Sequence, residues 1–199
     1  MEINANALAG ALMFAGALQF VLFLIVAEAL YPGYSVSRNY VSDLGVGQSA
    51  NIFNSSVFLL GLAAVASVYY LRKSFPSKNV FHAFMLLCGF GAMGVGVFSE
   101  KFGILHTIFS LITFVFGALS AIASFKVQRK PFSYFSLALG IISIISLTIF
   151  FVFELNEYLM PSLSQFNYLG LGCGGLERMI VYPVLVWALG FGGYLMGEK

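Results

Sequence analysis

Residues 132–153, FSYFSLALGIISIISLTIFFVF, form a run of 22 residues without a single charged side chain. A hydrocarbon core about 30 Å thick is crossed by roughly 20 apolar residues in an α-helix. Lipid offers no water to the backbone N–H and C=O groups, so a helix must satisfy them along such a run. The stretch therefore predicts a transmembrane helix.

Similar apolar runs recur along the chain, at about 5–29, 51–71, 79–98, 104–125 and 179–196. They are too long and too uniformly apolar for the short alternating strands of an outer-membrane barrel. We therefore predict an all-α fold, a polytopic membrane bundle of six transmembrane helices, with residues 1–199 forming one domain. Pro183 would then lie in the first turn of the last span, where a proline costs little.

The composition excludes other broad classes of protein. Of the 199 residues, 60% are hydrophobic and 9% are charged, whereas a soluble domain is about one quarter charged. The net charge of +2 is too small, and the basic residues too scattered, to predict nucleic-acid binding. Two cysteines and two histidines do not match a zinc-finger spacing. The sequence therefore assigns neither a metal nor a cofactor.

The glycines of the third predicted span match the spacing of a dinucleotide-binding motif but not its structural context. Gly89, Gly91, Gly94 and Gly96 lie inside an apolar run, whereas a phosphate-binding loop needs a strand before it and a helix after it. Small residues in a membrane helix let a neighbouring helix approach closely. We expect these glycines to pack helices together.

The distribution of Lys and Arg predicts the orientation of the bundle. With six spans, both termini share one side with the second and fourth connections. That side carries seven basic residues: Arg72, Lys73, Lys78, Lys126, Arg129, Lys130 and Lys199. The opposite side carries three, which are Arg38, Lys101 and Arg178. By the positive-inside rule we expect a cell-membrane protein with cytoplasmic termini, whose long connections 30–50 and 154–178 face outward.

Acidic residues gather on the predicted outer side, and they define a candidate site. Six of the eight acids lie there: Glu28, Asp43, Glu100, Glu154, Glu157 and Glu177. His106 begins the fourth span on that side, close in sequence to Glu100. A carboxylate can orient an imidazole for acid–base work. We therefore take His106, Asp43 and Glu100 as candidate catalytic residues.

A second set of residues near the same rim could bind a ligand. Arg178 carries the planar fork that suits a phosphate or a carboxylate, although an ion pair with a nearby acid explains it equally. Tyr182 follows Arg178 by four residues and so shares its helix face. With their neighbours, these give the candidate ligand-binding residues Arg178, Glu177, Arg38 and Tyr182.

The fourth predicted span carries a polar stripe at intervals of three and four residues. Its members are His106, Ser110, Thr113, Gly117, Ser120 and Ser124. Residues at this spacing share one face of a helix. We expect that face to point into the bundle, away from lipid.

Three functions remain open from the residues alone. A protein that binds membrane lipid, a partner membrane protein or a second copy of itself needs no catalytic group. A lipid-active enzyme would use His106 with Asp43 and Glu100, although hydrolase motifs such as GxSxG and HExxH are missing from the sequence. A small transporter is a weaker alternative, because no charged residue lies deep in a predicted span and transport sites usually lie at the midplane.

Three short motifs carry a resemblance to a known family. The stretches RNYVSDLG, FSEKFGILH and GGLERMIVYP, together with six short-looped spans, resemble a family of small, largely archaeal membrane proteins catalogued as a domain of unknown function. The likeness covers nearly the whole chain. It implies a six-helix membrane fold, and it supplies no activity, substrate or catalytic residue.

Overall fold

The protein is an all-α bundle, as the computed structural model shows for residues 4–159 and 168–198. Within these residues, six helices are long and apolar enough to cross a membrane, which confirms the predicted fold. The helices are α1 (Ala5–Leu30), α2 (Ala50–Ser74), α3 (Asn79–Val97), α4 (Ile104–Ala123), α5 (Phe132–Leu159) and α6 (Gly172–Gly197). Short 3-10 turns occur between them: η1 (Ser42–Gly45), η2 (Gly47–Ser49), η3 (Glu100–Phe102), η4 (Ser124–Lys126) and η6 (Tyr168–Gly170).

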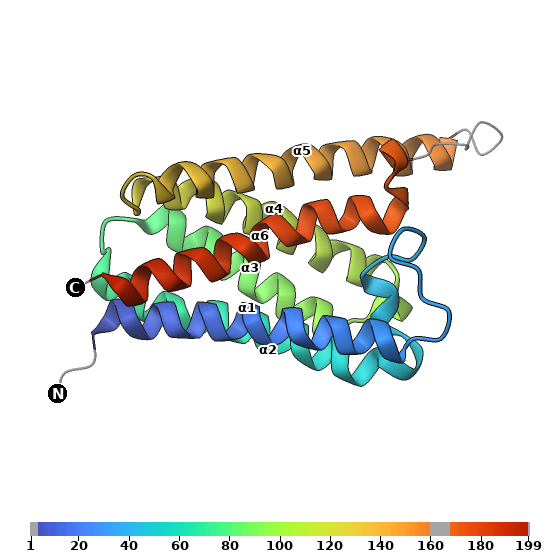
Figure 1. Ribbon diagram of the computed structural model, residues 1–199, viewed down its shortest axis with the longest axis horizontal. Coiled ribbons are helices and arrows are strands. Elements are labelled where there is room, and N and C mark those ends of the chain that lie inside the picture. The colour runs from blue at the N-terminus through green and yellow to red at the C-terminus, as the bar shows by residue number, and fades with distance from the viewer. Residues whose placement is uncertain (1–3, 160–167, 199) are drawn as a thin grey trace.

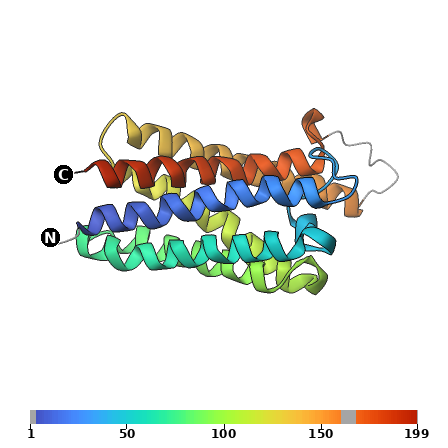
Figure 2. The ribbon, with the colours of Figure 1, turned by 60° about the horizontal axis from the view of Figure 1, so that its bottom comes forward.

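The six helices form a closed ring in chain order. Each helix packs against the next one, and α6 returns to pack against α1. The start of α1 and the end of α6 lie together at one end of the bundle, which we call the terminal end (Figures 1 and 2). The connection between α1 and α2, residues 31–49, lies at the opposite end, which we call the loop end.

Glycines bring the backbones of neighbouring helices into direct contact. A Cβ atom on Gly61 of α2 would lie 2.4 Å from the carbonyl oxygen of Gly89 in α3, and one on Gly89 would lie 2.7 Å from a methyl of Val65. Contacts this short leave no room for any side chain. The expectation that the third-span glycines pack helices is confirmed for Gly89, and small residues are what such close approach requires.

The sixth helix begins at Gly172 rather than near residue 179, so it is longer than the apolar run. Pro183 is consequently inside the helix, and its predicted place in the first turn is wrong. A proline interrupts the backbone hydrogen-bond ladder of its own helix. Close to this break, the hydroxyl of Ser143 in α5 donates to the carbonyl of Ile180 at 2.8 Å, the kind of side-chain compensation that prolines in membrane helices receive.

The polar stripe of the fourth span points inward, as expected. His106, Gly117 and Ser120 are buried, and so is Ser124 in η4. The hydroxyl of Ser120 donates to the carbonyl of Phe116 at 2.7 Å, four residues back along the helix. Hydroxyl groups on this face therefore stay hydrogen-bonded inside the bundle.

Candidate functional site

The connection between α1 and α2 folds across the loop end and becomes part of the core. Leu44 is fully buried, and only 3% of Val41 is exposed. The carbonyl of Leu44 accepts a hydrogen bond from the Ser49 hydroxyl at 2.8 Å, and the carbonyl of Gly45 accepts one from the Asn54 amide at 3.0 Å. Because its side chains are buried and its backbone is hydrogen-bonded, the connection packs against the helices and closes the bundle at the loop end.

Arg178 ties this connection to α6. Its Nη2 lies 2.7 Å from Glu28 Oε1 and 2.6 Å from the Tyr34 hydroxyl. Its Nη1 donates to the backbone carbonyls of Val36, Asn39 and Gly174. Both terminal nitrogens therefore face acceptors within the protein. Arg178 acts here as the clamp of the connection, and this arrangement favours the ion-pair interpretation over a free anion-binding fork.

Tyr34 links the guanidinium of Arg178 to the next turn of the connection. Its hydroxyl accepts from Arg178 and donates to the carbonyl of Tyr40 at 2.9 Å. Burial raises the pKa of Tyr34 to about 12, and the hydrogen bond from Arg178 acts in the opposite direction. The phenol therefore stays protonated and keeps its donor role at physiological pH.

Glu177 precedes Arg178 in the chain but points into the bundle. It is 5% exposed, and its Oε2 accepts a hydrogen bond from the backbone N–H of Val41. Neighbouring residues of one helix thus hold the same connection by two opposite means, since Arg178 donates to its carbonyls and Glu177 accepts from an amide. The carboxylate also lies in the wall of an internal cavity.

Two further carboxyl groups meet beside this point. Asp43 Oδ2 accepts from the side-chain amide of Asn39 at 2.8 Å and from the N–H of Tyr40 at 3.0 Å. Glu100 of η3 lies close enough to Asp43 of η1 for the two carboxyl groups to interact electrostatically. Burial, which is the largest cause, and the neighbouring Asp43 carboxyl together raise the pKa of Glu100 to about 7. A carboxyl group beside another is harder to ionise than one that stands alone.

This raised pKa predicts how stability depends on pH. Between the ordinary value of 4.5 and about 7, the folded protein holds a proton on Glu100 that the unfolded chain has lost. Stability should therefore be highest below pH 4.5 as far as Glu100 decides it, and should fall as the pH rises towards 7. We expect Glu100→Gln to flatten this part of the curve, measured as thermal midpoint in detergent from pH 5 to 8. An unchanged slope in the variant would assign the dependence to other groups.

His106 lies at the same end of the bundle but takes other partners than Glu100. Its Nδ1 lies 2.8 Å from the carbonyl of Phe98, and its Nε2 lies 3.3 Å from the hydroxyl of Ser110. A carbonyl can only accept, so Nδ1 carries a proton, and in the neutral imidazole Nε2 is then the acceptor. The imidazole is thereby oriented by the backbone instead of by a carboxylate.

An internal cavity of about 110 Å³ opens between these groups and the middle of the bundle. Its wall comes from α1, α2, α3, α4, α6 and the connection 31–49, while α5 packs outside against α4 and α6. Near the loop end the wall includes Ser42, His106, Ser110, Thr113 and Glu177. Towards the terminal end it is apolar and reaches Met13, Met85 and Trp187. The cavity is thus an apolar chamber with polar groups near the loop end.

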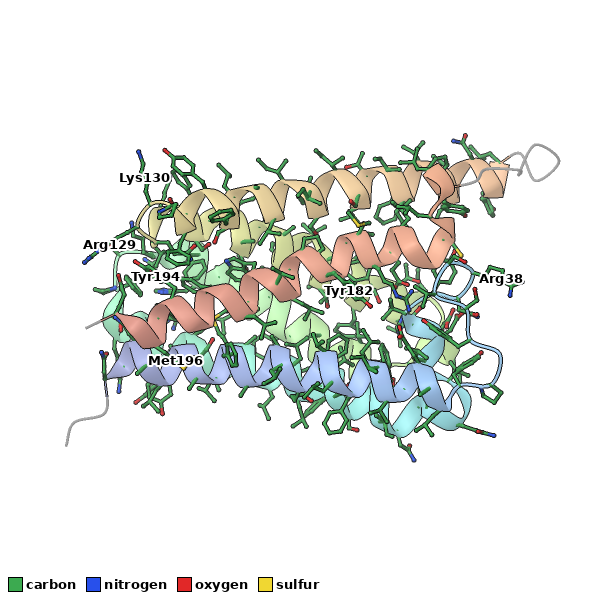
Figure 3. The ribbon with its side chains drawn as sticks, viewed as in Figure 1. Arg38, Arg129, Lys130, Tyr182, Tyr194 and Met196 are labelled. Carbon is green, nitrogen blue, oxygen red and sulfur yellow. The ribbon has the colours of Figure 1, made fainter. Side chains whose placement is uncertain are left out.

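The predicted site residues therefore occupy different environments, of which the clamp around Arg178 is the first. Asp43 and Glu100 meet each other, whereas His106 and Glu177 line the cavity. Arg38 is exposed and points away from the bundle at the loop end (Figure 3). Tyr182 is 40% exposed on α6 and does not line the cavity, but it lies near enough to Arg178 to act on it electrostatically.

Three participants of the site were not predicted, namely Tyr34, Val41 and Ser110. Tyr34 and Val41 act through the connection, which reads in sequence as an ordinary polar loop. Ser110 belongs to the predicted polar stripe of α4, and its spacing of four from His106 was the signal that could have identified it. In the described residues, no three His, Cys, Asp or Glu side chains gather in a way that could hold a metal ion.

A comparison with protein families gives one result for nearly the whole chain. The model of the family described as protein of unknown function DUF998 matches residues 14–193. The chain belongs to the DUF998 family. Comparisons with curated proteins and with solved structures give no match. For this DUF998 protein, function has to be argued from the clamp, the carboxyl groups and the cavity.

Proposed function

We propose that this DUF998 membrane protein binds lipid, and that its internal cavity holds part of one hydrocarbon chain. The observation that carries the proposal is the apolar wall of that cavity, which runs from the loop end towards Met13 and Trp187. An engineered cavity of about 150 Å³ lined by apolar side chains binds benzene. A chamber of about 110 Å³ therefore suits part of a single chain. It does not suit the two chains of a phospholipid or a partner helix.

Filling the cavity is expected to abolish this binding. Ala92 of α3 is 2% exposed and lines the chamber, so Ala92→Leu places three more carbon atoms inside it. Ala83 lies on the same helix and is exposed, so Ala83→Leu adds the same atoms on the outside. Native mass spectrometry of the proteins purified in mild detergent should show a retained lipid in the wild type and in Ala83→Leu, and its loss from Ala92→Leu.

Two results would count against the proposal. One is equal lipid retention by the Ala92→Leu and Ala83→Leu proteins. The other is the absence of any retained or added chain in the wild type. Because overpacking a core costs typically 1–3 kcal/mol, the thermal midpoint of each variant is measured alongside. A folded Ala92→Leu protein that lacks lipid isolates the effect of the cavity.

We also propose that the protein lies in the cell membrane with both termini cytoplasmic and the loop end outside. Support comes from the seven-to-three count of basic residues, in which Lys199 lies outside the described residues, and from the positive-inside rule. The two ends of the chain lie together, since the Asn4 side chain donates to the carbonyl of Glu198 at 3.3 Å. A fluorescent protein that matures only in the cytoplasm, fused after residue 199, should fluoresce. If instead a phosphatase that is active only in the periplasm is active when fused at that position, the proposed orientation is wrong.

A further inference from the structure

We infer that the cavity selects a chain whose head group is an uncharged hydrogen-bond donor, so that a long-chain alcohol is the ligand class that fits. This inference rests on the proposed lipid binding and goes further by naming the chemistry of the head group. It follows from whether the polar side chains near the loop end of the cavity can accept or donate a hydrogen bond. Two of them, His106 and Glu177, come from different helices and converge on the same chamber.

The first of these groups is an acceptor because of its own hydrogen bond. Nδ1 of His106 donates to the Phe98 carbonyl at 2.8 Å, and in the neutral imidazole this leaves Nε2 with a lone pair. The hydroxyl of Ser110 is the donor nearest to Nε2, at the long distance of 3.3 Å. An O–H···N bond this long is weaker than a normal one. A ligand hydroxyl entering from the cavity could therefore compete for Nε2.

The second group, Glu177, presents oxygen atoms. Its Oε2 accepts from the N–H of Val41, and the described residues supply no donor to its other oxygen. An oxygen of a carboxyl group that carries no proton accepts hydrogen bonds. This oxygen belongs to a residue of the cavity wall. A head group that donates a hydrogen bond would give it a partner, whereas a head group that only accepts would not.

The surrounding charges argue against a negatively charged head group. Asp43 and Glu100 lie near enough to Glu177 to act on it electrostatically, and a like charge added to such a group is repelled. The nearest cation, Arg178, is already paired with Glu28 at 2.7 Å. A positively charged head group would meet no repulsion, but moving an ammonium ion out of water costs several kcal/mol. A hydroxyl avoids both costs and supplies the required donor.

A series of ligands that share one chain and differ in head group tests the inference. Dodecanol, dodecanoate and dodecylamine are each added to the full-length protein in lipid nanodiscs, and displacement of a fluorescent chain probe is measured. We expect dodecanol to bind at least about tenfold more tightly than dodecanoate. Ala92→Leu should remove the binding of all three, because the chain no longer fits.

Glu177→Gln provides a second measurement on the same series. It replaces a carboxyl oxygen of the cavity wall with an amide that can donate to an acceptor, so the preference for dodecanol over dodecanoate should fall towards one. Glu154→Gln is the matched control. Glu154 is a carboxylate at the loop end that accepts from the Tyr40 hydroxyl at 2.6 Å and does not line the cavity, so its variant should keep the preference.

The outcomes separate the inference from the proposed function. If dodecanoate binds as tightly as dodecanol and Ala92→Leu blocks both, lipid binding stands and the head-group inference is overturned. Tighter binding of dodecylamine than of dodecanol overturns the choice of an uncharged head group in the same way. If none of the three binds, or Ala92→Leu changes nothing, the proposed function itself fails. The wild-type ligand series decides these points even if Glu177→Gln does not fold.

Discussion

Replacing Arg178 with methionine is expected to cost about 3–5 kcal/mol of unfolding free energy, the loss that follows when one partner of a buried ion pair is removed. The side chain of Arg178 is 6% exposed and that of Glu28 is 22% exposed. Methionine keeps much of the volume but leaves Glu28 without its cation. It also removes the donors to the Tyr34 hydroxyl and to the carbonyls of Val36 and Gly174.

Arg38→Met is the control for this change. Arg38 belongs to the same connection but is exposed and points away from the bundle (Figure 3), so its loss should alter stability by less than about 0.5 kcal/mol. For a chain of this length, 1 kcal/mol corresponds to about 2–4 °C in thermal midpoint. We therefore expect a drop on the order of 10 °C for Arg178→Met. Equal midpoints for the two variants would show that the clamp contributes nothing.

The fold could be predicted because lipid permits so few solutions. Runs such as 132–153 exceed the length of a membrane crossing without a charge, and only a helix satisfies their backbone in hydrocarbon. The start of α6 was missed for the opposite reason. Residues 172–178, GCGGLER, are polar and rich in glycine, so their local pattern predicts a loop. They are helical because the connection 31–49 packs over them, which is a tertiary contact.

The candidate site was predictable in location and not in pairing. Asp43, Glu100, His106, Glu177 and Arg178 all lie at the loop end, since charged groups collect where membrane helices leave the lipid. Which groups they bond to depends on distances in the folded protein, and the spacing of residues in the sequence does not give those distances. His106 bonds to a backbone carbonyl, Glu177 to a backbone amide, and Arg178 to carbonyls of a distant loop. Backbone groups occur at every residue, so a sequence cannot indicate which one a side chain will choose.

Gly174→Ala is expected to be the second most damaging of the single changes considered, although only one methyl group is added. A Cβ atom at this position would lie 1.9 Å from the carbonyl oxygen of Asn39 and 2.6 Å from that of Val36. Those are backbone atoms of the connection, so they cannot turn aside as a flexible side chain would. The connection must lift away from α6, which would weaken the Gly174 N–H bond to the Ser37 carbonyl at 3.1 Å.

The expected cost is about 3 kcal/mol, the upper end for overpacking a well-filled interior. In thermal midpoint this corresponds to about 6–12 °C. Gly193→Ala supplies the matched control on the same helix, because no described atom beyond its neighbouring residues and its own helix backbone lies within 4 Å of the added carbon. There the higher helix propensity of alanine should stabilise the protein by roughly 0.5–1 kcal/mol.

The two alanine variants should therefore move the midpoint in opposite directions, although the chemical change is identical. Gly174→Ala should also make Cys173 more reactive, because the thiol donates to the Arg38 carbonyl at 3.1 Å in the docked connection. The rate of labelling by a membrane-impermeant maleimide measures that release, and Gly193→Ala should label at the wild-type rate. A stable Gly174→Ala protein with an unchanged labelling rate would mean that the connection is not packed against α6 at this glycine. The connection could then no longer be described as closing the bundle at the loop end.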